Sequence, residues 1–476
     1  MNAAAEPASP AAHAPATPVT DSWVEDTETP VSAFLKLRAS APGQPAFLLE
    51  SAEQGRAGRY SFIGYQPRQV LRWSLGDPGD PYALVQRELD RVATSQPPGV
   101  ELPFGGGAVG MFAYDLVRTV EPLGEPGPDE LGLPDLALMF TDTLLAFDHL
   151  KHTVTVVAHP ADDAGTARAK VTAIREILGG PLPAVARGPA PAHRSAPRFR
   201  ANMTRERFEA NVARIVDYIY AGDAFQVVPS QRWSAPTPVS GFSIYRGLRA
   251  VNPSPYMYYL DFGDFELAGA SPEPLLTVSG RRVSTTPIAG TRPRGATAEQ
   301  DAQHARELLA DPKERAEHVM LVDLGRNDIG RVCEYGSVRV DDFMVVENYS
   351  HVMHIVSNVS GTLRPDVRAL DALRAVLPAG TLSGAPKVRA MEIIDELEPV
   401  KRCGYGGAIG WASYGGDLDT CIHIRTAVIK DGNVHIQAGG GTVADAQPAN
   451  EYEESVNKSK AVLQAIETAV SQPGWE

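Results

Sequence analysis

Residues 287–295 read Pro-Ile-Ala-Gly-Thr-Arg-Pro-Arg-Gly, and this segment says most about how the chain folds. Its two prolines fix the backbone φ angle, and its two glycines permit backbone geometry that other residues resist. Two arginines stand beside them. The combination predicts a rigid turn that faces an anion. An ordinary surface turn is the alternative for a stretch of this composition.

The overall composition is that of an ordinary globular protein. The chain has 476 residues, of which 43% are hydrophobic and 21% charged, enough for two large domains or several small ones. No run of about 18 apolar residues occurs, so we expect no membrane-spanning helix. The formal charge of −14 argues against a nucleic-acid-binding surface and gives no attraction to anionic lipid. An anionic substrate would therefore depend on local cations or a metal.

The first 20 residues, MNAAAEPASPAAHAPATPVT, are rich in Ala and Pro and have neither a basic start nor an apolar core. We expect a disordered N-terminal tail over residues 1–20 rather than a signal peptide. The three cysteines, Cys333, Cys403 and Cys421, are far apart and odd in number. They indicate reduced thiols in a cytoplasmic protein rather than disulfides or a zinc site.

A second segment rich in Pro, Ala and Gly, residues 178–197, lacks the period of a helix or a strand. We interpret residues 178–200 as a linker between an N-terminal domain over 21–177 and a C-terminal domain over 201–476. Short apolar runs separated by turn residues predict a mostly β N-terminal domain with a few helices. Predicted strands in the C-terminal domain often follow one another directly. This favours an α+β fold of layered antiparallel sheets flanked by helices.

Apolar periodicity and capping residues give the expected elements. Strands are predicted at residues 46–49, 60–63, 108–112, 144–147, 153–158, 225–228, 256–261, 275–278, 345–348, 422–429 and 434–438. Helices are predicted at 163–178, between the N-cap Thr204 and the C-cap Gly222, and at 298–309, 314–325, 367–375, 387–396 and 449–470. The apolar face of the last helix is expected to consist of Tyr452, Val456, Leu463, Ile466 and Val470.

Two of these helices carry glutamates three residues apart. Glu451 and Glu454 stand in the first turn of the last helix, and Lys458 follows one turn after Glu454. Glu317 likewise stands three residues after Glu314 in the helix at 314–325. Mg²⁺ prefers carboxylate oxygens and keeps several waters, so one glutamate from each helix plus an anionic substrate could complete its shell. A solvated helix turn with a salt bridge between Glu454 and Lys458 is the alternative.

Three further features could carry chemistry. Gly439, Gly440 and Gly441 follow a predicted strand, and their backbone N–H groups could cradle an anion or simply make a tight turn. Arg425 lies in the strand-like run 422–429, either as a solvent-facing edge residue or as a buried ligand for a carboxylate. His354 lies in an apolar segment, where a histidine is structural or catalytic.

Together these features resemble the anthranilate synthase component I branch of the chorismate-utilising enzymes. The matching strings are PYM (255–257), ASPE (270–273), PIAGTRPRG (287–295), EHVMLVDLGRND (317–328), VMHIVS (352–357), GTLSGAPKVRAMEII (380–394), YGGAIG (405–410) and DLDTCIHIR (417–425). The likeness covers residues 200–470, and the N-terminal likeness rests on LLES (48–51) and RYSFIG (59–64).

The resemblance implies a reaction and a set of roles. Ammonia adds to C2 of chorismate, the 4-hydroxyl leaves, and pyruvate is eliminated to give anthranilate. Glu317 and Glu454, with Glu451 nearby, would hold Mg²⁺. Glu273 would be the general acid, His354 would assist pyruvate elimination, and Thr381 would line the pocket. The residues implied for chorismate are Gly290, Thr291, Tyr405, Arg425, Gly439, Gly440, Gly441 and Lys458.

Two positions separate the branches of the resembled family. Its hydroxylating members carry a lysine base at the position of Gln226, and Gln226 cannot take a proton from water. Its folate-pathway member carries a nucleophilic lysine at the position of Ala289, which here has no nucleophile. The resemblance therefore implies direct attack of ammonia on C2. An enzyme that stops at aminodeoxyisochorismate, which His354 disfavours, and a catalytically silent tryptophan sensor are the alternatives.

The resemblance also implies partners. None of the three cysteines lies in a glutaminase signature, so ammonia would come from a separate glutamine amidotransferase subunit, in a heterotetramer. L-Tryptophan would inhibit by feedback between a regulatory N-terminal and a catalytic C-terminal domain. The residues implied for tryptophan are Leu49, Glu50, Ser51, Asn252, Pro255, Tyr256, Met257 and Cys421.

Overall fold

The structure of the chain is a computed structural model that describes residues 17–52, 57–92, 101–160, 164–183, 196–237, 239–349, 352–472 and 475. The tail expected over residues 1–20 lies largely outside this part of the chain. Strand β1 (Val19–Val24) begins inside the expected tail, so the prediction of disorder was wrong for residues 19 and 20. Those two residues pair with a later strand, a contact that composition does not show.

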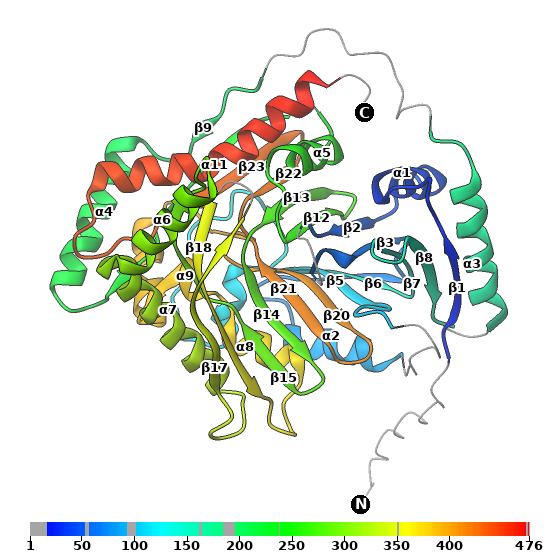
Figure 1. Cartoon of the computed structure of the whole chain (residues 1–476), viewed down its shortest axis with the longest axis horizontal. Coiled ribbons are helices and arrows are strands. Elements are labelled where there is room, and N and C mark those ends of the chain that lie inside the picture. Colours follow the sequence, from blue (N-terminus) through cyan, green and yellow to red (C-terminus); the bar gives the residue numbers. More distant parts are fainter. Residues whose placement is uncertain are drawn as a thin grey trace, which may run out of the picture.

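Two large antiparallel sheets form the body of the molecule (Figure 1). The first has the order β1, β8 (Thr153–Ala158), β7 (Thr143–Asp148), β3 (Tyr60–Tyr65), β2 (Ala46–Glu50), β12 (Tyr256–Asp261), β13 (Phe265–Ser271), β22 (Thr426–Lys430), β23 (Asn433–Gly439), β11 (Ser230–Pro236) and β9 (Arg200–Ala201). The second has the order β16 (Ile288–Pro293), β18 (Val352–Thr362), β15 (Arg282–Thr285), β14 (Pro274–Ser279), β21 (Leu418–Ile422), β20 (Ala408–Ser413), β5 (Gly107–Phe112), β6 (Leu136–Thr141) and β4 (Gln69–Trp73), and β17 (Arg339–Asn348) pairs with β18. A small separate pair consists of β10 (Gln226–Val227) and β19 (Gly384–Ala385).

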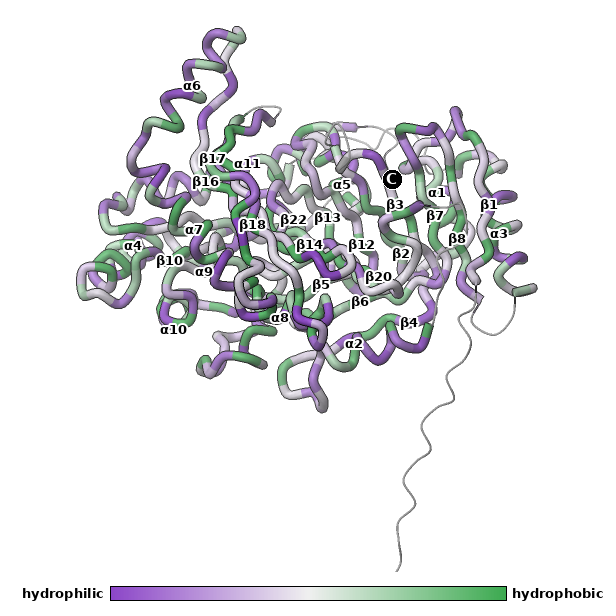
Figure 2. The backbone as a smooth tube through the Cα atoms, turned by 60° about the horizontal axis from the view of Figure 1, so that its bottom comes forward, coloured by the Kyte–Doolittle hydropathy of each residue, from purple (hydrophilic) through white to green (hydrophobic). Residues whose placement is uncertain are grey.

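Helices cover the outer faces of the two sheets. Those packed on the first sheet are α1 (Pro30–Ser40), α3 (Ala164–Gly179), α5 (Gly241–Val251) and α11 (Pro448–Ser471). Those packed on the second are α2 (Pro81–Asp90), α7 (Pro312–Gly330) and α8 (Ala369–Val376). The remaining helices are α4 (Arg205–Tyr220), α6 (Ala298–Ala310), α9 (Gly380–Ser383) and α10 (Lys387–Leu397), with 3-10 turns at Ala57–Arg59 and Tyr114–Thr119. Helix α6 extends away from the body in Figure 2 and buries only Leu308 among its side chains. Within the described residues, no helix is both long and apolar enough to cross a membrane.

The core is divided by the alternation of side chains along the strands. Phe47 of β2 packs in a cluster that contains residues of both sheets, whereas its neighbour Leu48 packs with helices α1 and α5. Tyr258 and Tyr259 of β12 divide in the same way. Both faces of these central strands are therefore buried, which explains why their sequences read as continuous apolar runs.

The two expected domains share both sheets. Strand β2 pairs with β12, with Leu48 opposite Tyr259, and β5 pairs with β20, with Gly110 opposite Gly410. The division into 21–177 and 201–476 is therefore not a division between separate sheets. Local composition marked the connection between the parts, but the strand pairing across it is long-range. Of the expected linker, Leu178 and Gly179 lie in α3 and Arg200 in β9, while residues 184–195 fall outside the described chain.

The predicted helices are confirmed, since each overlaps a helix of the structure. Thr204 caps α4 as expected, because its side chain accepts a hydrogen bond from Arg207 N. The apolar face expected for α11 is only partly correct. Ile466 and Val470 are buried, but Ser455 and Ser459 are buried as well. Small side chains suit this face because α11 packs closely on α5, where a Cβ on Gly247 would lie 2.2 Å from Ala465 O.

Candidate active site

The segment at 287–295 forms a strand rather than the predicted turn. Strand β16 pairs with β18, and the register shifts between Ala289 and Thr291. Gly290 lies at this irregularity with φ of +69°, a region that favours glycine. The turn prediction was wrong because proline and glycine also occur at strand edges and bulges, and the pairing partners lie about 60 residues or more further along the chain. Ala289 is buried, so its methyl group faces the interior.

The two arginines of this segment are neutralised by nearby acids. Arg292 contacts Asp311 at 2.9 Å and Glu314 at 3.0 Å, and Arg294 contacts Asp301 at 2.5 Å. These carboxylates lie in α6 and at the start of α7. The arginines therefore hold β16 against the helices and are not available as anion ligands.

Glu273 and Thr381, two residues expected in the site, lie side by side. Glu273 lies between β13 and β14, and its Oε1 accepts a hydrogen bond from Thr381 Oγ1 at 2.9 Å. Burial raises the pKa of Glu273 to about 7, against the opposing effects of Thr381 and the more distant Lys458. Near neutral pH the carboxyl group is therefore present in both forms, which suits a general acid.

His354 is oriented by the strand next to it. Its Nδ1 lies 2.9 Å from Gly290 O and 3.1 Å from Thr291 Oγ1. Because a carbonyl oxygen can only accept, Nδ1 carries the proton in the neutral ring and Nε2 is left as the basic nitrogen. Burial lowers the pKa of His354, so the neutral form is favoured. Gly290 and Thr291, both expected to bind chorismate, thus lie beside the expected elimination base.

The carboxylates of α7 and α11 approach one another across the glycine loop. A Cβ on Gly440 would lie 2.9 Å from Glu454 Oε1 and 3.2 Å from Glu451 Oε2, so both carboxylates lie against the backbone of this glycine. Gln226 Nε2 donates to Glu317 Oε1 at 3.2 Å. The ion pair between Lys458 and Glu454, which belonged to the alternative interpretation of this helix turn, is present at 2.7 Å. The loop continues from β23, whose last residue is Gly439.

These carboxylates repel one another. Burial, with the charges of Glu454 and Glu317, raises the pKa of Glu451 to about 7. Burial also raises the pKa of Glu317, and Glu314 and Glu454 add to the effect. Glu451 Oε2 and Gln226 Oε1 are buried without a hydrogen-bond partner among the described atoms. Crowded carboxylate oxygens of this kind fit a hard divalent cation such as Mg²⁺. In the described part of the chain no three Asp, Glu, His or Cys side chains could hold a metal alone, so part of its shell would come from water and substrate.

Arg425 does not lie in a strand. The predicted strand 422–429 is broken, since β21 ends at Ile422, β22 begins at Thr426, and Arg425 has φ of +52°. The periodicity of apolar residues does not show where the backbone takes a positive φ angle. The Arg425 side chain makes no hydrogen bond or ion pair with any described residue, and burial lowers its pKa. A desolvated guanidinium without a carboxylate partner is a ready ligand for an anionic group. The buried phenol of Tyr405 lies close enough to interact with it electrostatically.

A cavity of about 230 Å³ lies between the sheets. Seven of the eight residues expected for tryptophan line it: Leu49, Glu50, Ser51, Pro255, Tyr256, Met257 and Cys421. Asn252 does not line it and instead caps the C-terminus of α5. Arg249 holds Glu50 at 2.8 Å, and the Tyr245 hydroxyl also donates to this carboxylate.

Sequence reasoning missed other residues of this cavity. Asp419 accepts a hydrogen bond from Tyr256 OH at 3.0 Å, and burial raises the pKa of Asp419 to about 6. Asp419 lies two residues before Cys421 in the same strand, and side chains two residues apart point to the same face of a sheet. The prediction of Cys421 could therefore have been extended to Asp419. Pro272 and Pro274 also line the cavity, on either side of Glu273. The wall between this cavity and the Glu273 site is therefore a single stretch of chain.

Comparison with known proteins places the chain in a family. Residues 44–464 match the family described as chorismate binding enzyme. The chain belongs to this family. It is 49% identical over 474 residues to anthranilate synthase component 1 of Pseudomonas putida, covering 95% of each chain. It is also 49% identical over 467 residues to the protein of that name from Thermus thermophilus, covering 95% of this chain and 98% of the relative.

Solved structures show the same fold. Anthranilate synthase component I from Streptococcus pneumoniae superposes with a TM-score of 0.79 at 40% identity, over 86% of this chain and 93% of that one. The menaquinone-specific isochorismate synthase from Escherichia coli superposes with a TM-score of 0.70 at 19% identity, over 96% of both chains, and shows the fold alone. The expected α+β architecture of layered antiparallel sheets is confirmed.

Proposed function

We propose that the chain is the large subunit of an anthranilate synthase, which converts chorismate and ammonia to anthranilate, pyruvate and water in the first step of tryptophan biosynthesis. The single observation that carries the proposal is the near full-length identity of 49% to anthranilate synthase component 1. The site agrees with it, because Gln226 contacts Glu317 and the buried Ala289 offers no amine.

Binding of chorismate, a dianion, depends on local positive charge because the chain carries a net −14. Arg425 supplies a guanidinium that has no partner among the described residues, whereas the charge of Lys458 is shared with Glu454, its ion-pair partner at 2.7 Å. The backbone of Gly440 and Gly441 lies against the same carboxylates and Gln226. The site therefore has two parts: Arg425, which suits a substrate carboxylate, and the glutamates of α7 and α11, which suit a cation.

In the amination step, ammonia forms a bond to C2 while the 4-hydroxyl group leaves. Protonated Glu273 gives its proton to the departing oxygen, which leaves as water, and the added ammonium loses a proton to solvent. The raised pKa of Glu273, about 7, keeps part of this carboxyl protonated at neutral pH. Gln226 can neither activate water nor compete as a nucleophile.

In the elimination step, neutral His354 takes the C2 proton at Nε2. The C–H electron pair forms the ring double bond, the ether C–O bond breaks, and pyruvate leaves as its enolate. The hydrogen bond from Nδ1 to Gly290 O fixes the required tautomer. Consumption of chorismate without anthranilate would favour the alternative, aminodeoxyisochorismate synthase.

Mg²⁺ is the cation that we assign to Glu317 and Glu454, with Glu451 beside them. A bound magnesium ion would neutralise the substrate carboxylate and draw charge away from the ring. The buried Oε2 of Glu451, which has no hydrogen-bond partner within the described chain, supports this assignment.

A glutamine amidotransferase is the partner that we propose, in a cytoplasmic heterotetramer. The name component 1, carried by the relatives, implies a second component. The chain alone should use ammonium salts at raised pH, because only the unprotonated amine attacks.

The cavity beside Glu273 is the site that we propose for L-tryptophan as feedback inhibitor. Apolar side chains such as Met257 and Pro255 suit the indole ring, and Glu50 and Asp419 suit the amino group. Because Pro272 and Pro274 line the cavity, an occupant there would press on the segment that carries Glu273.

The test is an assay of the purified chain with chorismate, Mg²⁺ and ammonium, with anthranilate fluorescence and chorismate absorbance followed together. Anthranilate formation that tryptophan inhibits is the expected result. Loss of chorismate without fluorescence would replace the proposal by the alternative, and no loss of chorismate would leave a silent tryptophan-binding protein.

A further inference from the structure

Arg402 is a buried cation behind the candidate active site. Its side chain is 2% exposed, and that of its partner Glu398 is 6% exposed. The pair is bidentate, with Arg402 Nη2 at 2.5 Å from Glu398 Oε1 and Nε at 2.9 Å from Oε2. A buried ion pair contributes little net stability compared with apolar packing, because both charges lose their hydration. Its remaining contacts indicate another role.

Arg402 donates to two backbone carbonyls next to site residues. Nη1 donates to Leu382 O at 2.6 Å, one residue after Thr381. Nη2 donates to Val228 O at 2.6 Å, two residues after Gln226. One planar group thus ties together the segment that carries the Gln226 amide and the segment that carries the Thr381 hydroxyl.

The same ion pair reaches two further parts of the site. The Arg402 guanidinium lies 5.6 Å from the ring centroid of Tyr405. Glu398 Oε1 accepts from the backbone N and the side-chain Oγ of Ser230, each at 2.8 Å. Ser230 opens strand β11, which pairs with Gly439 at the start of the glycine loop.

We propose that Arg402, held by Glu398, is a positioning residue that sets the Gln226 amide and the Thr381 hydroxyl relative to Glu273. It acts through the carbonyls of Val228 and Leu382. The inference rests on the proposed function, because its readout is anthranilate formation.

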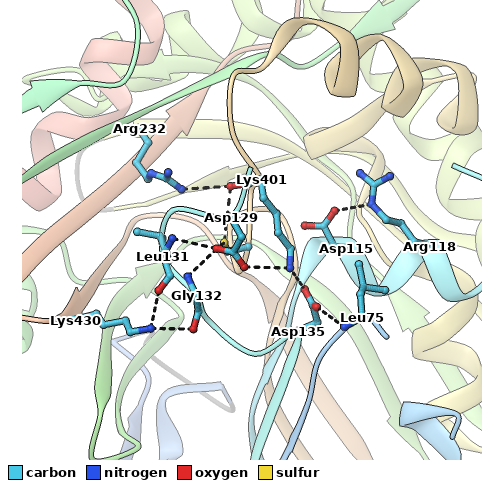
Figure 3. Close-up of polar contacts among 11 residues, drawn as sticks. Leu75, Asp115, Arg118, Asp129, Leu131, Gly132, Asp135, Arg232, Lys401 and Lys430 are labelled. Atoms are coloured by element: carbon cyan, nitrogen blue, oxygen red, sulfur yellow. Dashed lines mark hydrogen bonds and ion pairs between the residues drawn. The ribbon is translucent and has the colours of Figure 1, made fainter. Parts of the chain in front are cut away.

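The neighbouring residue provides a matched control. Lys401 is also buried, but its ammonium faces the N-terminal strands, where it contacts Asp135 at 2.8 Å and Asp129 at 3.5 Å (Figure 3). The ammonium contacts no residue expected in the site. A Lys401→Gln variant therefore breaks a buried ion pair at the adjacent position while leaving the contacts of Arg402 in place.

The experiment measures kcat per unit of free NH₃ against pH for wild type, R402K, T381V and K401Q. The Thr381 hydrogen bond stabilises ionised Glu273, so its loss in T381V should move the alkaline limb of the profile up by roughly half a pH unit. R402K should lower kcat by roughly 10–100-fold and move the limb in the same direction. K401Q should lower the thermal unfolding temperature without moving the limb.

The double variant T381V/R402K isolates the route of the effect. If Arg402 acts through Thr381, the limb of the double variant coincides with that of T381V. Additive shifts, or an R402K profile with the wild-type limb and kcat, would overturn the inference. If R402K does not fold, E398Q replaces it, and the same shift of the alkaline limb is expected. A wild-type pH profile for E398Q would also overturn the inference. Inactive wild type would reject the proposed function instead.

Discussion

Replacing Glu273 with glutamine tests the assigned proton donor directly. Glutamine keeps an oxygen that can accept the Thr381 hydrogen bond, seen at 2.9 Å, but it has no proton to give. General acid catalysis contributes typically 10²–10⁴-fold, so we expect E273Q to lower kcat by about that factor, or roughly 3–5 kcal/mol of transition-state stabilisation.

The pH dependence follows from the raised pKa of Glu273. With a pKa of about 7, only about one tenth of these carboxyl groups keep their proton at pH 8. The wild-type rate per unit of free NH₃ should therefore fall as pH rises above 7, because the acid form is lost. The residual rate of E273Q should lack this limb.

At pH 8 the E273Q substitution should raise stability although it lowers activity. The folded-state pKa of Glu273 lies above its ordinary 4.5, so its contribution to stability is complete below about pH 4.5 and is lost as pH rises through 7. The difference corresponds to at most about 3 kcal/mol at pH 8, less whatever solvent screening removes, since the side chain is partly exposed. E273Q should therefore be more stable than wild type at pH 8 and equally stable near pH 4.5.

Two measurements check this account of Glu273: anthranilate fluorescence with ammonium from pH 6 to 9, and denaturant unfolding at pH 4.5 and 8. Glu273→Asp is the control, since it keeps an acid but moves it. If E273Q retains more than a third of the wild-type kcat, or keeps the alkaline limb, Glu273 is not the proton donor.

Four other substitutions have defined outcomes. A289K should abolish normal anthranilate production by placing an amine at the buried methyl site, and product analysis showing unimpaired anthranilate would mean that this position matters less than argued. R425M should raise the KM for chorismate roughly 100-fold with a smaller effect on kcat, and steady-state kinetics with an unchanged KM would exclude it as a ligand. E454Q should raise the Mg²⁺ concentration for half-maximal activity roughly 10–100-fold, whereas an unaltered magnesium titration would remove it from the metal site. E50Q should weaken tryptophan inhibition roughly tenfold at unchanged kcat, and inhibition curves that overlay wild type would move the inhibitor elsewhere.

The sequence predicts local elements well because their signals are local. Helix α7 and helix α11 follow from periodicity and capping. Spacing singled out the pairs Glu314/Glu317 and Glu451/Glu454, and only the family resemblance selected Glu317 and Glu454 among them. The string PIAGTRPRG was misjudged as a turn, because its pairing with β18 depends on residues about 60 or more positions away. The break at Arg425 has the same kind of cause, since a positive φ leaves no mark on an apolar run.

The sharing of sheets could not be predicted from composition. The sequence of strand β2 indicates only a strand of the N-terminal domain, yet its partner β12 lies about 200 residues further along the chain. This pairing places Leu49 and Glu50 in one cavity with Met257 and Cys421. Arg402 was missed for a related reason. The residues next to it in the sequence do not show that its guanidinium reaches the carbonyls of two separate segments.

The most direct test of the central claim is the product formed by the isolated chain from chorismate, Mg²⁺ and ammonium at about pH 8. We predict anthranilate and pyruvate in equal amounts, with fluorescence that grows as chorismate absorbance falls and that tryptophan suppresses. Isochorismate, 4-amino-4-deoxychorismate or accumulated aminodeoxyisochorismate in place of anthranilate would contradict the account of Gln226, Ala289 and His354.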